Sequence, residues 1–185
     1  MKRAKRRRNR AKKRRATLHL PLTAEQERVV SLIQSAWEDV EHPGDNDIDG
    51  CGCGREECQS VVAYFAGRSW EEITFQGLRK HCPSAWDTPF GYMTPAAFQY
   101  FLPAFLLMFL RDRKKLDVLA SSIVWTLCPH QDWRARVEGF SMEQQEAILE
   151  FLLCVVELVG YDDAEGGVSF WRNRLEKDRI FVERA

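Results

Sequence analysis

The most continuous apolar stretch of the chain, residues 93–113, has the pattern of a buried α-helix. Its large apolar side chains recur at helical spacings and make a stripe wider than one face: Phe98, Phe101, Leu102, Phe105, Leu106, Leu107, Met108, Phe109 and Leu110. Thr94 is a suitable N-cap, and Pro95 suits the first helical position because it has a preset φ and no amide to leave unbonded. Pro103 predicts a kink, since proline removes one backbone hydrogen bond. We therefore expect a kinked central helix that ends in the charged residues 111–115.

A second apolar helix is predicted between Ser141 and Val159. Ser141 and Gln144 have the spacing of a capping box, and Gly160 is a suitable residue to end the helix. Nearly every position between them is apolar. We expect this helix to lie directly against the central one.

Shorter amphipathic segments complete the pattern, each bounded by a capping residue, a proline or a glycine. They cover residues 23–42, 56–67, 69–81, 116–127 and 169–181, with a loop at 165–167. The predicted fold is all-α: a single irregular helical bundle of about six to seven helices around the kinked central helix. We expect residues 18–185 to form this helical domain and residues 1–17 to form a disordered basic N-terminal arm.

The formal net charge of zero hides a strong asymmetry. Residues 1–15 hold 11 of the 27 lysines and arginines and no acidic residue, so the remainder has 16 basic against 27 acidic residues, a net charge of −11. A basic arm of this kind can bind nucleic acid by neutralising phosphates. It contains no aromatic residue to stack on bases, and two alternatives stay open. The arm folds back on its own acidic domain, or translation begins downstream of it.

The chain is expected to be cytoplasmic. The basic start is not followed by the apolar segment of a secretory signal, and the apolar part of the central helix is too short to span a membrane. The six cysteines are therefore interpreted as thiols or ligands rather than disulfides.

Residues 45–56 match the calcium-loop pattern D-x-D-x-D-G-x5-E. The candidate calcium ligands are Asp45, Asp47, Asp49 and Glu56, because alternate carboxylates on a tightly turned loop can converge on one hard cation. Pro43 and Gly44 interrupt the entering helix, and the loop has no second copy with which to pair. The alternative is a polar connector in which aspartate and glycine serve only to form turns.

The same loop contains Cys51, Cys53 and Cys58, which suggest a zinc site. His42, His81 or Cys82 could be the fourth ligand. The spacing departs from the usual pairs of cysteines separated by two to four residues, and free or packed cysteines are the alternative. Thiolates and carboxylates select different ions, so one loop should not serve both metals.

Several of these residues occur together in a known pattern. They are Cys53, Glu57, Cys58, Phe65, Gly67, Trp70, Met93–Phe98 and Tyr100–Ala104. Over residues 29–152 the chain resembles a family of small bacterial proteins known only as a domain of unknown function, with T-P-x-A-F-x-Y-x-L-P-A as its most distinctive string. The resemblance implies a small, mainly helical fold and carries over no catalytic residue.

The sequence contains no recognised catalytic string, so we expect a protein that is not an enzyme. The favoured hypothesis is an interaction protein whose acidic body binds a protein partner, as immunity or regulatory proteins do. The alternatives are a calcium-binding module at residues 45–56 and nucleic-acid association through the basic arm.

Overall fold

A computed structural model of the protein describes residues 21–128, 134–160 and 162–183. The basic arm predicted for residues 1–17 lies outside these ranges. The described elements, in order, are α2 (Ala24–Ala36), η1 (Asp45–Asp47), α3 (Glu56–Phe65), η2 (Trp70–Glu72), α4 (Phe75–His81), η3 (Pro89–Tyr92), α5 (Pro95–Leu116), α6 (Val118–Thr126), α7 (Arg134–Val137), α8 (Met142–Val159) and α9 (Asp162–Glu183).

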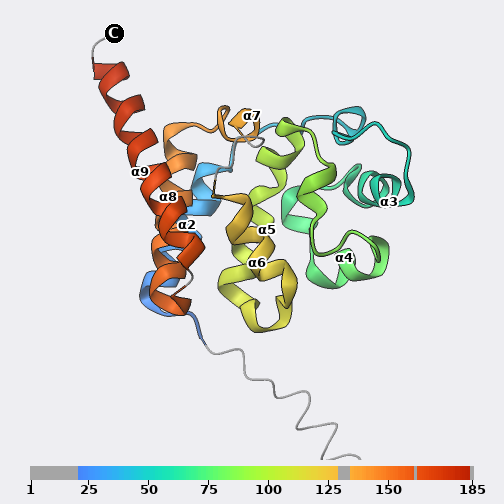
Figure 1. Cartoon of the computed structure of the whole chain (residues 1–185), viewed down its shortest axis with the longest axis horizontal. Helices are drawn as coiled ribbons and strands as arrows, with labels where there is room; N and C mark the ends of the chain where they lie inside the picture. Colours follow the sequence, from blue (N-terminus) through green and yellow to red (C-terminus); the bar gives the residue numbers. More distant parts are fainter. Residues whose placement is uncertain (1–20, 129–133, 161, 184–185) are drawn as a thin grey trace, which may run out of the picture.

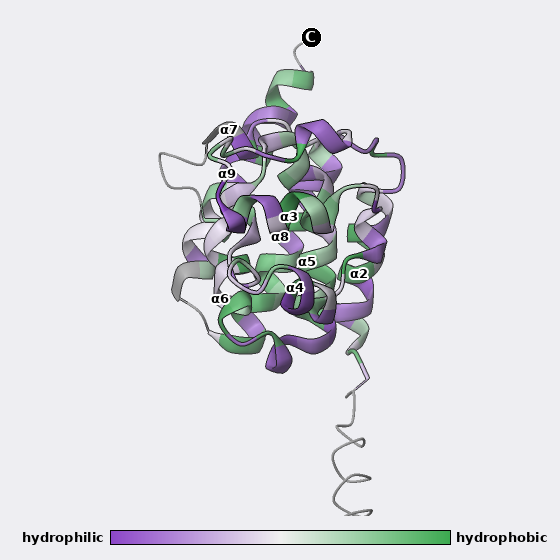
Figure 2. Ribbon diagram, turned by 90° about the vertical axis from the view of Figure 1, so that its right-hand side faces the viewer, coloured by the Kyte–Doolittle hydropathy of each residue, from purple (hydrophilic) through white to green (hydrophobic). Residues whose placement is uncertain are grey.

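The described part is all-α, as predicted: seven helices of at least seven residues, the single-turn α7 and three short 3₁₀ turns. In Figure 1, α8 and α9 lie side by side and pack with α2, while α3 and α4 lie on the opposite side of α5. Figure 2 shows apolar colour running along α5 in the middle of the molecule. Among the described helices, none has the length and apolar character needed to cross a membrane.

The N-terminus of α5 follows the prediction. The Thr94 side chain accepts a hydrogen bond from the Ala97 amide (3.1 Å), and Pro95 is the first helical residue. Phe98, Phe101 and the apolar residues from Leu102 to Leu110 are buried, except Met108, which is partly buried. The central position of this helix is therefore encoded locally by its cap and by its wide apolar stripe.

The central helix is kinked as predicted, but the kink lies at Asp112 rather than at Pro103. The only non-helical dihedrals within α5 are at Asp112 (φ −143°, ψ 29°). Pro103 has no amide to donate to the carbonyl of Gln99, four residues earlier. The indole Nε1 of Trp37 donates to that carbonyl instead, at 2.8 Å, so the helix continues through the proline without an unpaired acceptor.

The helix α8 has the predicted capping box and ends at Gly160 in the left-handed region (φ 61°). Its main neighbours, however, are α9 and α2. It reaches α5 through Phe151 and Phe109, whose ring centroids lie 5.3 Å apart. The two apolar helices are thus in contact, but each packs mostly against other elements.

Three predicted boundaries need correction. The first helix ends at Ala36 rather than at His42, because Trp37 leaves the helix to become fully buried beside α5. The segment 69–81 is divided: the Ser69 capping box starts only η2, and Thr74 caps the separate helix α4.

The third correction concerns α9, which is continuous through the loop predicted at 165–167. A β-carbon at Gly167 would lie 3.0 Å from Leu152 Cδ1 and 3.1 Å from Cys128 Sγ. This glycine therefore lets α9 approach its neighbours closely rather than ending a helix.

Candidate functional site

The candidate site is the stretch between α2 and the start of α3, residues 38–57, which we call the acidic connector. It contains eight acidic residues and one basic residue, Arg55, giving a net charge of −7. Seven of the eight acidic residues are exposed and Glu57 is partly buried. In the part of the chain that the structure describes, no ion pair involves one of these carboxylates.

The connector is fixed to the start of α5 although most of it lacks regular structure. Ile48 is fully buried, and its carbonyl accepts a hydrogen bond from the Thr94 amide (3.0 Å). The Gly50 amide donates to the carbonyl of Tyr92 (2.8 Å), beside an isolated antiparallel bridge between Asp49 and Met93. The connector therefore exposes its carboxylates on a backbone that hydrogen bonds anchor to the start of α5.

Gly50 makes this close contact possible. A β-carbon at this position would lie 2.3 Å from the backbone oxygen of Met93 and 2.7 Å from the nitrogen of Thr94. The connector cannot pack in this way with a larger residue at position 50, because both atoms belong to the backbone.

The predicted calcium ligands have other roles in this structure. An oxygen of Asp45 accepts a hydrogen bond from the Gly67 amide (2.7 Å), and Asp49 Oδ1 accepts from the amides of Cys51 and Gly52 (2.9 Å each). Asp47 is exposed at the end of η1, and Glu56 is the first residue of α3. The structure does not bring the four side chains together as a ligand group. Their contacts are those of a turn-forming connector.

The predicted zinc ligands do come together. The sulfur atoms of Cys51, Cys53 and Cys58 all lie within 4.8 Å of one another, and those of Cys53 and Cys58 are 3.0 Å apart. Within the described ranges, this is the only group of three or more cysteine, histidine or acidic side chains arranged closely enough to hold a metal ion. Cys51 and Cys53 are exposed, while Cys58 is buried.

None of the three proposed fourth ligands joins this cluster. The Nδ1 of His42 accepts a hydrogen bond from the Gly44 amide (2.9 Å), and its ring packs edge-on against Tyr100. His81 stacks on Tyr64 with the ring centroids 5.5 Å apart, and the Cys82 thiol donates to the Ser60 carbonyl (3.4 Å). The cluster thus supplies three protein ligands from the described chain.

The pKa values of Cys53 and Cys58 are shifted in opposite directions. Hydrogen bonds from the Cys51 and Cys58 side chains and from the Arg55 backbone lower the pKa of Cys53. The hydrogen bond with Cys53, together with burial, raises the pKa of Cys58 to about 12. As the pH rises, the first negative charge is therefore expected on Cys53 rather than on Cys58.

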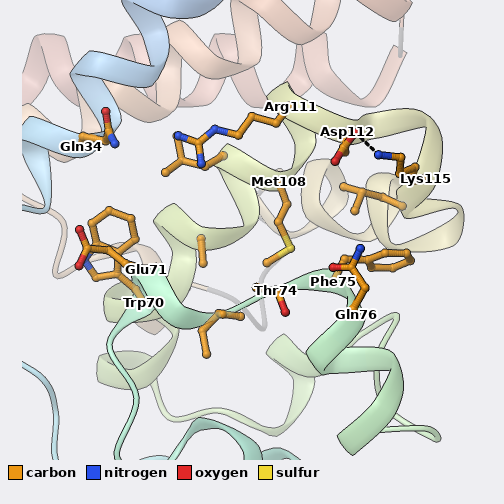
Figure 3. Close-up of a pocket in the computed structure, with 14 residues that line it drawn as sticks. Gln34, Trp70, Glu71, Thr74, Phe75, Gln76, Met108, Arg111, Asp112 and Lys115 are labelled. Atoms are coloured by element: carbon orange, nitrogen blue, oxygen red, sulfur yellow. Dashed lines mark hydrogen bonds and ion pairs between the residues drawn. The ribbon is translucent and has the colours of Figure 1, made fainter. Parts of the chain in front are cut away.

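A separate pocket of about 330 Å³ lies where α5 breaks at Asp112. Figure 3 shows Met108 in its middle, Arg111 reaching toward Gln34 on one side and the ion pair between Asp112 and Lys115 (2.7 Å) on the other. Its lining contains no cysteine, histidine or serine. Its one threonine, Thr74, caps α4.

No pattern in the sequence predicted this pocket. The available signal was the charged segment 111–115, which follows the apolar stripe of α5 directly. The position of the backbone break depends on tertiary packing and could not be read from that segment alone.

These features define a small helical protein with an acidic connector anchored to the start of α5 and a cluster of three thiols. The chain belongs to a family of unknown function, DUF6714, whose model matches residues 25–175. This match covers most of the chain and confirms the resemblance to a domain of unknown function. The chain matches no curated protein and no solved structure.

Proposed function

We propose that this protein is a non-enzymatic interaction protein that binds a basic surface of a partner protein through the acidic connector. The observation that carries the proposal is the combination of charge and anchoring. Eight acidic residues lie on a backbone that Ile48 and Gly50 fix to the start of α5.

Fixed carboxylates suit recognition for two physical reasons. Several carboxylates on an anchored backbone produce a local negative potential, which attracts a basic partner protein and accelerates association. The partner also does not have to order the connector on binding, so less conformational entropy is lost than with a flexible loop. The described cationic side chains form no ion pair with these carboxylates, so those other than Asp45 and Asp49, which accept backbone hydrogen bonds, are available to a partner.

The test uses affinity capture from host extract at low salt, followed by identification of the bound proteins. The variant carries Glu38→Gln, Asp39→Asn and Glu41→Gln, three exposed positions for whose side chains the structure records no hydrogen bond. The matched control carries Glu157→Gln, Glu165→Gln and Glu176→Gln, which remove the same charge from exposed positions of α8 and α9.

We expect a discrete protein partner that the wild type and the control capture, that salt releases and that the connector variant captures several-fold less well. Equal capture by both variants would place the interface elsewhere. No partner at low salt would count against an interaction function altogether.

A second candidate function is nucleic-acid association through the basic arm, which the charge of residues 1–15 favours. It requires different residues from the first, so the two functions can be tested separately.

A further inference from the structure

We propose that Cys51, Cys53 and Cys58 form a thiolate site for one Zn²⁺ ion, with the fourth coordination position facing solvent. The site goes beyond the proposed partner-binding function and does not depend on it. Its basis is the convergence of the three sulfur atoms within 4.8 Å of one another. In a tetrahedral zinc site, Zn–S bonds of about 2.3 Å place the sulfurs about 3.8 Å apart, so small side-chain movements suffice to admit the ion.

The local sequence explains why these thiols meet despite their unusual spacing. Cys51 and Cys53 alternate with glycines, and Gly52 and Gly54 both occupy the left-handed region (φ 59° and 66°). These two residues curl the chain so that both cysteines face the first turn of α3, where Cys58 lies. Positive φ at two alternating positions is accessible to glycine at little cost.

An aspartate steadies the start of this curl. Asp49 Oδ1 accepts hydrogen bonds from the backbone amides of Cys51 and Gly52. Its carboxylate is thus used to order the loop that carries the thiols. On the other side, Cys58 is buried at the base of the cluster with 1% of its surface exposed. Two exposed ligands and one buried ligand leave the open side of the site toward solvent.

The donor set selects the ion. Thiolates favour zinc and other soft or borderline cations, whereas calcium requires oxygen ligands. The net charge of −7 on the surrounding connector further favours a divalent cation. Because His42, His81 and Cys82 do not lie in the cluster, water supplies the fourth ligand. Three protein ligands and one exchangeable position are typical of zinc sites that can take up a further ligand.

Binding is a ligand exchange without redox change. Three S–H bonds are broken and three Zn–S bonds form, the thiolates displace coordinated water from the hydrated ion apart from the one water that stays, and three protons pass to the buffer. Because Cys51 and Cys53 precede α3 while Cys58 belongs to it, the ion joins the connector to that helix. Zinc should therefore stabilise the folded chain by mass action.

The test uses the full chain, reduced and freed of metal by a chelator, and then titrated anaerobically with Co²⁺ as a spectroscopic probe and with Zn²⁺ as competitor. We expect one Co²⁺ per chain with a sulfur-to-cobalt charge-transfer band, displacement of that band by Zn²⁺, and a higher melting temperature with Zn²⁺ but not with Ca²⁺.

The variants Cys51→Ser and Cys53→Ser should lose the band, and because both positions are exposed they should keep the wild-type circular dichroism. Cys128→Ser is the matched control and should keep the band, since Cys128 lies on α6's carboxyl side, away from the cluster. Two results would each overturn the proposal: no stoichiometric Co²⁺ binding by the reduced chain, or an unchanged band in both exposed variants. None of these measurements involves a protein partner, so this proposal and the proposed function can fail separately.

Discussion

The contact between Trp37 and Gln99 shows how one side chain can maintain a helix through a proline. Pro103 leaves the Gln99 carbonyl without its usual donor, and the Trp37 indole donates to it at 2.8 Å from a fully buried position. We predict that Trp37→Phe destabilises the protein by about 1–3 kcal/mol beyond the effect of the smaller ring, because a buried acceptor is left unpaired. Urea unfolding followed by circular dichroism measures this cost.

A double-mutant cycle isolates the hydrogen bond from the packing. In a Pro103→Ala background, residue 103 regains an amide that can donate to Gln99, so Trp37→Phe should cost about 1 kcal/mol less than in the wild type. If Trp37→Phe lowered the free energy of unfolding equally in both backgrounds, the indole would not be the donor that replaces the missing amide of Pro103. The helix could be predicted from the sequence, but the indole 62 residues away that donates to the Gln99 carbonyl could not.

The buried thiol of Cys82 should make the stability of the protein depend on pH. Its side chain is fully buried, and this burial raises its pKa to about 11. In the unfolded chain a thiol titrates near 8.5, so between about pH 8.5 and 11 the unfolded state loses this proton first. The free energy of unfolding should therefore fall as the pH rises through this range, by at most about 1.4 kcal/mol per pH unit from this group.

The measurement is urea unfolding at several pH values from 8 to 11 with a reductant present. Cys82→Ala removes the titrating group and should show a shallower decline than the wild type. Identical slopes in the two proteins would assign the decline to other groups, among them Cys58, whose pKa is also raised.

At the scale of the elements, helix boundaries that a local motif sets could be predicted well, and those that tertiary contacts set could not. The capping boxes at Thr23 and Ser141 are formed as expected, because both partners lie within four residues. The end of α2 and the continuity of α9 depend instead on contacts with distant segments. No local pattern contains that information.

The candidate site shows the same division. The aspartate pattern at residues 45–56 matched a calcium loop, yet Asp45 bonds to Gly67 and Asp49 to the following amides. Cys51, Cys53 and Cys58 match their metal-site pattern less well, yet the structure brings their side chains together. Spacing rules for cysteine ligands assume regular turns, and they do not account for Gly52 and Gly54 in the left-handed region.

The neighbouring glycines of α9, Gly166 and Gly167, should respond differently to replacement by alanine. Gly166 is exposed with no atom within 4 Å of an added β-carbon, whereas Gly167 faces Leu152 and Cys128 at 3.0 and 3.1 Å. Gly166→Ala should stabilise the protein by about 0.5–1 kcal/mol, because alanine loses less backbone entropy in a helix. Gly167→Ala should give no gain or a loss, because the new methyl group crowds both neighbours. Thermal unfolding of the two variants compares them directly. An equal gain in both would mean that α9 does not approach its neighbours as closely as described.

At the scale of the whole molecule, charge is divided between the chain's first residues and its body. Residues 1–15 carry 11 positive charges, and the rest of the chain carries a net charge of −11. The two parts should therefore respond oppositely to a polyanion such as DNA or heparin. A basic segment releases counterions from the phosphates, while an acidic body is repelled at low salt.

Deleting residues 1–15 separates these effects. We predict that heparin and DNA columns retain the full chain at low salt and release it as salt rises, because binding through several lysines and arginines weakens steeply with ionic strength. The shortened chain should pass through both columns. Retention of the shortened chain would show that the body holds the polyanion binding site. A full chain that is not retained would mean that its basic residues are neutralised by its own acidic body. Both results would contradict nucleic-acid association through the arm, while the acidic connector and its partner would remain to be tested independently.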